Sequence, residues 1–346
     1  MLLTTLTSRY IHSMQPSPKI LIDFEKIKDP YCGLGQYCAH LKIFFDQSKL
    51  NIHYWIPNKF EKLAKKITYL LPKSDVFHAI HQDCPYWPWS KKTKFILTIL
   101  DLNALYETSD PLVQEAFKRN LQKKINRASH IAFISKFTQS EVAKSFDLKN
   151  KKTHVIYCGI ALTEISKKPK IIPDSKFIFS IGTVVPKKNF HVLIDFLKKL
   201  PIEYKIVLAG TTFHSYAAEM LKRISDEGLT DRFFLVGTID ENEKRWYYDH
   251  ACSFIFPSLF EGFGLPVAEA MSLGLPLFIS DKTSLPEIGG DDAYYFRNFE
   301  ADSMAKVFLE GLENFNEEKK LRLIKRAKLF DWQQAAESYL NIYTQP

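Results

Sequence analysis

Two glutamates lie around a glycine-rich turn in residues 256–271, and this segment is the strongest candidate for chemistry. It reads Phe-Pro-Ser-Leu-Phe-Glu-Gly-Phe-Gly-Leu-Pro-Val-Ala-Glu-Ala-Met, which places carboxylates at Glu261 and Glu269. An apolar strand is expected to end at Phe256, and Pro266 suits the first turn of a helix. Free backbone N–H groups at such a turn suit a phosphate, and a carboxylate that accepts from two adjacent hydroxyls can hold a ribose. The alternative interpretation is an ordinary strand–helix turn with two solvated glutamates.

A second strand–helix junction, residues 181–190, carries two adjacent lysines behind a glycine. Lys187 and Lys188 follow Gly182 and stand where a helix is expected to begin. The helix dipole is positive there, so two cations are poorly placed unless an anion offsets them. A diphosphate would do so. The alternative is an exposed basic turn.

The third candidate segment is a G-x-G pattern that follows the first expected strand. Its glycines are Gly33 and Gly35. Such a pattern allows a backbone to approach a ligand or a neighbouring domain, but on its own it is a weak signal. A tight turn explains it equally well.

These segments require a scaffold that brings the ends of several strands together. Apolar runs of strand length alternate with helix-period segments along the chain, which predicts parallel sheets covered by helices on both faces. The expected strands are 20–24, 52–56, 75–78, 95–99, 131–134, 154–157, 177–181, 205–209, 233–236, 253–256 and 276–279. The expected helices are 36–45, 111–126, 136–146, 189–199, 215–227, 266–273, 301–312 and 332–343. With a polar linker at 166–173, the pattern predicts an α/β protein of two Rossmann-like, doubly wound domains that face a cleft.

Length and composition limit the class of protein. The 346 residues correspond to about two domains, and 46% apolar with 25% charged residues excludes disordered and fibrous classes. The net charge of +8 is uneven, since residues 1–165 carry +10 and residues 166–346 carry −2. This split predicts domains with different partners, one of them anionic, although no recognised module points to nucleic acid. The five cysteines include no C-x-x-C pair, which favours a reducing compartment. The sequence also shows no signal peptide or membrane-spanning run, so we expect the protein in the cytoplasm.

A basic stretch at residues 59–70 has the spacing of an amphipathic helix. Its apolar side chains recur on one stripe, and its lysines lie mostly off that stripe. These lysines are Lys59, Lys62, Lys65 and Lys66. Such a helix can lie on an anionic membrane surface. The alternative is a surface helix that packs on the core and exposes a solvated, charged face.

The three candidate segments, in this order, resemble the retaining glycosyltransferases of family 4, which have the GT-B fold. The most specific likeness is in residues 261–269, which match the E-x7-E motif of the family with its EGFGLP core. Residues 182–189 look like its G-T-x-x-P-R-K-N loop, with Lys187 where arginine is usual. Residues 33–37 resemble its G-x-G-R-Y loop, with Gln36 where arginine is common. The resemblance covers nearly the whole chain.

The resemblance implies a role for each matched residue. It places Lys187 and Lys188, beside Gly182, on the diphosphate of a nucleotide sugar, and Gly33 and Gly35 over the phosphates. Glu269 is expected on the ribose, Ile239 beside the base and Glu261 on the transferred sugar. The N–H groups of Phe263, Gly264 and Leu265 are expected to contact sugar or phosphate oxygens. No D-x-D triad occurs, which agrees with an enzyme without metal or other cofactor, where lysines and helix N-termini supply positive charge. The first expected domain, residues 1–165, faces the acceptor and the membrane, and the second, residues 166–330, binds the sugar donor. Residues 331–346 are expected to form a helix that crosses back to the first domain.

One position departs from the family pattern. The family usually carries T-I-H-D-L in its first domain, where the histidine contacts the sugar near its 6-hydroxyl, but this chain has Leu100 before Asp101. Leucine cannot donate that hydrogen bond. Three interpretations stay open: the sugar lacks that hydroxyl or leaves it unpaired, His78 or His81 replaces the histidine, or the chain is inactive. The candidate catalytic residues are Lys188, Glu261, His81 and Asp101.

The resemblance therefore predicts transfer of a hexose, with mannose from GDP-mannose favoured, and with retention of anomeric configuration. The expected acceptor is a growing glycan or lipid-linked glycan of lipopolysaccharide or another cell-surface polysaccharide, at the inner face of the cytoplasmic membrane. Two alternatives remain. A catalytically silent GT-B protein that binds sugar nucleotide or glycan has Leu100 as its only support. A nucleotide-sugar epimerase on the same fold is disfavoured by the E-x7-E motif.

Overall fold

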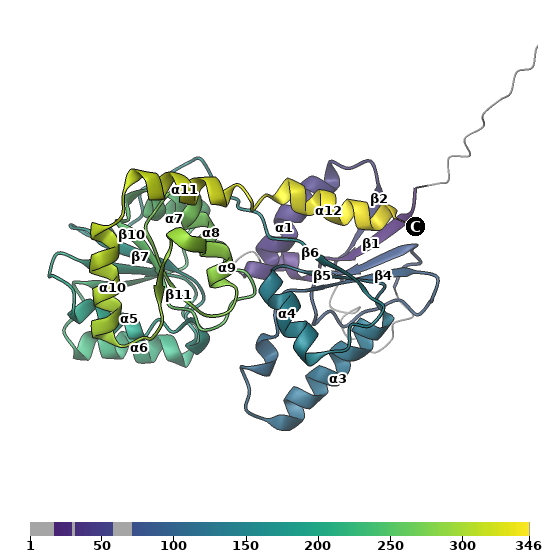
Figure 1. The fold of residues 1–346 in the computed structure, drawn as a ribbon, viewed down its shortest axis with the longest axis horizontal. Helices are drawn as coiled ribbons and strands as arrows, with labels where there is room; N and C mark the ends of the chain where they lie inside the picture. The colour runs from purple at the N-terminus through teal and green to yellow at the C-terminus, as the bar shows by residue number, and fades with distance from the viewer. Residues whose placement is uncertain (1–16, 30–31, 58–70, 346) are drawn as a thin grey trace, which may run out of the picture.

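The computed structural model describes residues 17–29, 32–57 and 71–345. Outside these ranges lie the four lysines of the predicted amphipathic helix, Lys59, Lys62, Lys65 and Lys66. The described part forms two six-stranded sheets that lie side by side along the long axis of the molecule (Figure 1). Within it, no helix is both long and apolar enough to cross a membrane.

The first sheet comes from the first half of the chain and has the order β2-β1-β3-β4-β5-β6. Its strands are β1 Lys19–Asp23, β2 Asn51–Trp55, β3 Val76–Ala79, β4 Lys94–Ile99, β5 His130–Phe133 and β6 Lys152–Val155. All paired strands are parallel. The strand order reverses between β1 and β3, and such a reversal opens a crevice at the carboxyl ends of the strands.

The second sheet has the order β12-β11-β10-β7-β8-β9 and is also parallel throughout. Its strands are β7 Phe177–Ile181, β8 Lys205–Ala209, β9 Phe233–Gly237, β10 Ser253–Phe256, β11 Leu277–Ser280 and β12 Tyr294–Phe296. Its reversal lies between β7 and β10. The loops that carry the two lysines and the two glutamates therefore start on either side of this point.

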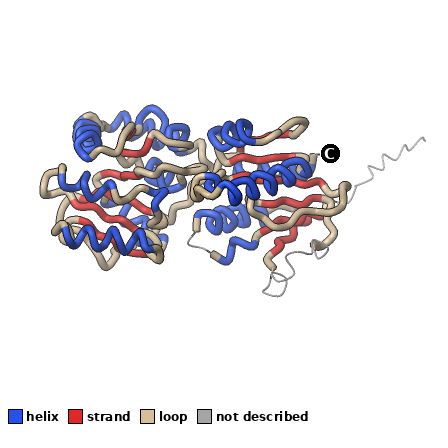
Figure 2. Tube along the Cα trace, turned by 90° about the horizontal axis from the view of Figure 1, so that it is seen from below, coloured by secondary structure: helices blue, strands red, loops and turns tan. Residues whose placement is uncertain are grey.

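Helices lie on both sides of the strands (Figure 2). They are α1 Gly33–Asp46, α3 Pro111–Arg127, α4 Lys136–Ser145, α5 Val192–Lys198, α6 Ser215–Asp226, α7 Glu241–His250, α8 Leu265–Ser272, α9 Leu285–Gly289, α10 Ala301–Glu313, α11 Glu317–Ala327 and α12 Trp332–Thr344. Strands such as β3, β5 and β10 are buried along their whole length, as expected for a sheet covered on both faces. The predicted architecture of two doubly wound units is confirmed.

The last helix, α12, lies along α1 against the first sheet (Figure 1). The Tyr339 hydroxyl lies 2.7 Å from the Tyr37 hydroxyl on α1 and 3.1 Å from Thr98 Oγ1 on β4. On β3, His78 Nδ1 lies 2.7 Å from the Tyr343 hydroxyl, and its Nε2 lies 2.7 Å from Thr98 Oγ1. All five side chains are buried. This polar network compensates for their desolvation and fixes the end of the chain on the first sheet.

The sequence prediction misses α7, α9, α11 and β12. The clearest case is α7, which starts with a capping box formed by Asp240 and Glu243. Its buried face combines Tyr247 and Tyr248 with Lys244. A lysine on the buried face interrupts the apolar periodicity on which the prediction of a helix depends.

Removing the Tyr339 hydroxyl should weaken the attachment of α12. Tyr339→Phe takes away the partner of the buried Tyr37 hydroxyl, and we expect the free energy of unfolding to fall by about 1–2 kcal/mol in urea denaturation. Ser338 is the preceding residue and is exposed, so Ser338→Ala is the control and should change stability by less than about 0.5 kcal/mol. Equal stability of the two variants would contradict a stabilising role for the network.

Candidate active site

A cavity of about 1450 Å³ lies between the carboxyl ends of the two sheets. Loops that follow β1, β3 and β4 line one side, and loops that follow β7, β9 and β10 line the other. These loops include both points at which the strand order reverses, where doubly wound sheets bind their ligands. The cavity therefore brings together residues from most of the chain.

The cavity is lined by every predicted site residue in the described part of the chain except Gly35. The lining residues are Gly33, His81, Asp101, Gly182, Lys187, Lys188, Ile239, Glu261, Phe263, Gly264, Leu265 and Glu269. A Cβ atom at Gly35 would lie 1.8 Å from the carbonyl oxygen of Asp29. The structure therefore shows a packing role for Gly35, between α1 and Asp29. Its contact with phosphates stays a prediction.

Lys188 and Glu261 form an ion pair within the second domain. Their side chains are 15% and 12% exposed, so each buried charge depends on the other for compensation. Lys188 ends the short 3-10 helix η4 (Pro186–Lys188), and its Nζ lies 5.0 Å from the centre of the Phe256 ring. The pair therefore holds a cation in a fixed place at the end of β10.

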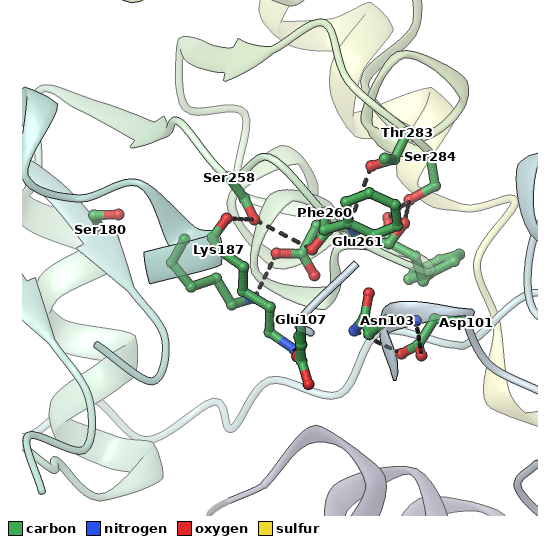
Figure 3. A network of polar contacts seen from close by, with 12 residues as sticks. Asp101, Asn103, Glu107, Ser180, Lys187, Ser258, Phe260, Glu261, Thr283 and Ser284 are labelled. Atoms are coloured by element: carbon green, nitrogen blue, oxygen red, sulfur yellow. Dashed lines mark hydrogen bonds and ion pairs between the residues drawn. The ribbon is translucent and has the colours of Figure 1, made fainter. Parts of the chain in front are cut away.

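Lys187 pairs across the cavity with a residue of the first domain. Its Nζ lies 2.6 Å from Oε1 of Glu107 (Figure 3). Beside this pair, the ring of Tyr106 packs against the ring of Phe260 at a tilt of 35°, with 3.9 Å between their centres. Sequence analysis missed Glu107, since no motif marks it. The two contacts join the loop after β4 to the loops after β7 and β10.

Two glycines shape the loop between β10 and α8. A Cβ atom at Gly262 would lie 2.1 Å from the carbonyl oxygen of Leu100, so no side chain fits where the two domains meet. Gly264 has a φ of 102°, in the left-handed region that glycine tolerates. Thr138 Oγ1 lies 3.2 Å from the Leu100 carbonyl oxygen and 3.3 Å from that of Gly262. The backbone of Leu100 thus helps to set the distance between the domains.

Glu269 is buried in the cavity wall and has two polar partners on α7. Lys244 Nζ lies 2.9 Å from its Oε1, and the Tyr248 hydroxyl donates to its Oε2 at 3.0 Å. Burial raises the pKa of Glu269, and Lys244 opposes that rise. Sequence analysis missed Lys244. The signal that could have found it is the spacing of Glu241, Lys244 and Tyr248, which places all three on one face of a helix.

Asp101 is committed to its own loop. Its carboxylate accepts hydrogen bonds from the backbone N and the Nδ2 of Asn103, both at 3.0 Å, and from Gln82 Nε2 at 3.2 Å. Gln82 Oε1 in turn accepts from the backbone N of Leu100 at 3.1 Å. Burial raises the pKa of Asp101. The contacts describe a carboxylate that shapes the loop, and its catalytic role stays a prediction.

The two candidate histidines differ in position. Both ring nitrogens of His78 belong to the network that holds α12, and burial lowers its pKa to about 3. His81 lines the cavity, and burial lowers its pKa to about 4. Its Nδ1 accepts from the backbone N of Asp83 at 3.2 Å, so its proton is on Nε2, 3.7 Å from Asp23 Oδ2. Only His81 of the two can therefore face a ligand.

Comparison with known proteins agrees with this geometry. Residues 162–330 match the family model described as glycosyl transferases group 1. The O-antigen chain mannosyltransferase B of Escherichia coli is 26% identical over 242 residues, which cover 65% of this chain and 63% of that protein. The O-antigen chain mannosyltransferase RfbU of Salmonella typhimurium is 28% identical over 202 residues, which cover 58% and 55%. The chain thus spans less than two thirds of the length of either relative.

Solved structures share the two-sheet arrangement over nearly the whole chain. Sucrose-phosphate synthase from Thermosynechococcus elongatus has a TM-score of 0.75 at 16% identity and covers 94% of this chain and 98% of its own. HepE from Anabaena, solved with UDP and glucose, has a TM-score of 0.72 at 16% identity and covers 95% and 100%. Residues 162–330 thus match the group 1 glycosyl transferases, and the chain as a whole has the GT-B fold.

Proposed function

We propose that this protein transfers a hexose, with mannose favoured, from a nucleoside diphosphate sugar to a glycan or lipid-linked acceptor during synthesis of lipopolysaccharide or another cell-surface polysaccharide. The observation that carries the proposal is the placement of Lys187, Lys188, Glu261 and Glu269 around one cavity at the point where the strand order of the second sheet reverses. Both bacterial relatives are mannosyltransferases of O-antigen chains, which supports mannose.

The two lysines are the proposed site of the diphosphate. In the structure they pair with Glu107 and Glu261, and a diphosphate that enters would replace these carboxylates as their partner. The N–H groups at the start of α8 add further positive potential. As the bond to the sugar breaks, negative charge grows on the diphosphate, and oriented cations stabilise that charge. Lysines can thus supply the positive charge without a metal ion.

The proposed reaction retains the anomeric configuration. The acceptor hydroxyl attacks the anomeric carbon on the face that the diphosphate leaves, and a diphosphate oxygen takes the hydroxyl proton. This route needs no protein nucleophile. The contacts of Asp101 support it, because this carboxylate accepts three hydrogen bonds from its own surroundings.

The acceptor and its location remain part of the proposal. The first domain is basic, and an anionic membrane surface would attract it. We propose that this domain faces the cytoplasmic membrane from the inner side. A silent protein that only binds sugar nucleotides is the second candidate, which the side chain of Leu100 favours because it cannot donate a hydrogen bond to the sugar.

A panel of nucleotide sugars tests the activity. We expect GDP-mannose to be hydrolysed slowly without acceptor, as measured by release of GDP, and we include 6-deoxy sugar donors because Leu100 offers no partner for a 6-hydroxyl. NMR of the transfer product tests retention. Binding of nucleotide without turnover of any donor would contradict the proposed activity and favour the silent protein.

Two alanine substitutions separate the proposed roles in the site. Lys188→Ala removes a cation that acts as charge develops, so we expect kcat to fall about 100-fold. Glu269→Ala removes a contact to the ribose, so KM for the sugar donor should rise about tenfold with a smaller change in kcat. The exposed Lys222 provides the control Lys222→Ala. Wild-type kinetics in both site variants would refute the assignment.

Binding to lipid vesicles tests the membrane proposal. Lys62, Lys65 and Lys66 are changed together to glutamate, which reverses three charges and should abolish binding to vesicles that contain anionic lipid. Vesicles of neutral lipid are the control and should bind neither protein. Unchanged binding of the triple variant to anionic vesicles would reject the membrane role of this segment.

A further inference from the structure

Lys244 is buried in the wall of the cavity between two carboxylates. Its Nζ lies 2.9 Å from Oε1 of Glu269 and 2.7 Å from Oε2 of Glu241. The residue is 5% exposed, and it lines the cavity. A lysine is rarely buried to this extent unless it is paired, so its contacts are the reason for its place on the inner face of α7.

The carboxylate of Glu269 is anchored on both oxygens and still has free acceptor positions. Lys244 donates to Oε1 and Tyr248 donates to Oε2. An ionised carboxylate accepts about four hydrogen bonds, so about two positions remain. These positions suit two adjacent hydroxyls, which is the pattern that a ribose diol presents. Both donors come from α7, a helix fixed at its start by the capping box of Asp240.

The charge state of Glu269 depends on Lys244. Burial raises the pKa of Glu269 and favours its neutral form, and the lysine opposes this. For Lys244 itself, burial acts to lower the pKa, but the carboxylates of Glu269 and Glu241 outweigh burial and raise it. Without the lysine, the buried carboxyl would lose its only cationic partner among the described residues.

Other groups near the pair are few within the described residues. On α7, Tyr248 contacts Glu269 and Glu241 contacts Lys244. From α1, Gln36 Nε2 lies 3.5 Å from Glu241 Oε1, and His40 interacts electrostatically with Glu241 and Lys244. The pKa of His40 is lowered by burial, which keeps it neutral near pH 7. Lys244 is thus the cation that faces Glu269.

We propose that Lys244 is a positioning residue, which keeps the Glu269 carboxylate ionised and aimed into the cavity so that it accepts two hydroxyls of the nucleotide ribose. This inference rests on the proposed function. It predicts that Lys244 affects ribose recognition and the pH range of binding, and that it does not affect the transfer step. If the lysine had a merely structural role, its substitution would change neither ribose recognition nor the pH range of binding.

The test compares GDP and UDP with their 2′,3′-dideoxy analogues by calorimetry. We expect wild-type protein to bind the better of the two ribonucleotides about tenfold more tightly than its analogue, because the analogue leaves a buried carboxylate unsatisfied. Lys244→Met and Lys244→Gln should reduce this ratio to about twofold or less. Lys244→Arg keeps the charge and should restore most of the ratio. Lys222→Met, on an exposed lysine, is the control.

The pH profile gives a second measurement. In Lys244→Met, the pKa of Glu269 should rise further, so ribonucleotide affinity should fall as the pH is lowered through the neutral range. The wild-type affinity should change less across this range, because Lys244 stabilises the ionised form. The kinetic counterpart is a rise in KM for the sugar donor with little change in kcat.

Two outcomes have different meanings. This inference alone would be overturned if folded Lys244→Met or Lys244→Gln kept the wild-type ratio of affinities for ribonucleotide and dideoxy analogue together with the wild-type pH profile. Failure of the wild-type protein to bind either GDP or UDP would overturn the proposed function, and this inference with it. Thermal unfolding of each variant establishes that it is folded, and the more conservative Lys244→Gln decides the matter where the methionine variant is unfolded.

Discussion

Compensation of buried charge is the constraint on which the cavity depends. Among the described residues, three lysines face it, and each is paired with a carboxylate: Lys187 with Glu107, Lys188 with Glu261, and Lys244 with Glu269. Without such partners, the buried charges of the Lys188 and Lys244 pairs would cost several kcal/mol each, whereas the Lys187–Glu107 pair is largely exposed and contributes little to stability. A bound diphosphate can replace the carboxylate at Lys187 and Lys188, because it carries the same sign of charge. At Lys244 the carboxylate is itself the proposed ligand-binding group, so that pair is expected to persist.

The contact between the two domains holds these groups at working distance. Glu287 accepts hydrogen bonds from the backbone N of Lys136 and Phe137, at the start of α4, at 2.8 Å each, and from the Tyr157 hydroxyl at 2.8 Å. A carboxylate there also suits the positive end of the helix dipole. Together with the close approach at Gly262, these contacts place the loop after β10 against the first domain. The sugar site therefore draws on both domains.

The sequence predicts the two doubly wound sheets well, because apolar strands and helix spacing alternate along most of the chain. It also predicts the residues that follow β7 and β10, where motif and topology agree. It misses Lys244, since a buried lysine interrupts the apolar pattern of α7, and it misses Glu107, whose pairing with Lys187 depends on how the domains meet. Spacing alone also does not distinguish a glycine that packs a helix from one that approaches a ligand, so the packing of Gly35 against Asp29 becomes visible only in the structure.

The most direct test is a crystal structure with a GDP-sugar or a UDP-sugar bound. We expect the diphosphate to lie within hydrogen-bonding distance of Lys187 Nζ, Lys188 Nζ and the N–H groups that begin α8, with Glu107 no longer paired with Lys187. We also expect the ribose hydroxyls on Glu269. A diphosphate bound elsewhere, with the Lys187–Glu107 and Lys188–Glu261 pairs intact, would contradict the proposed site.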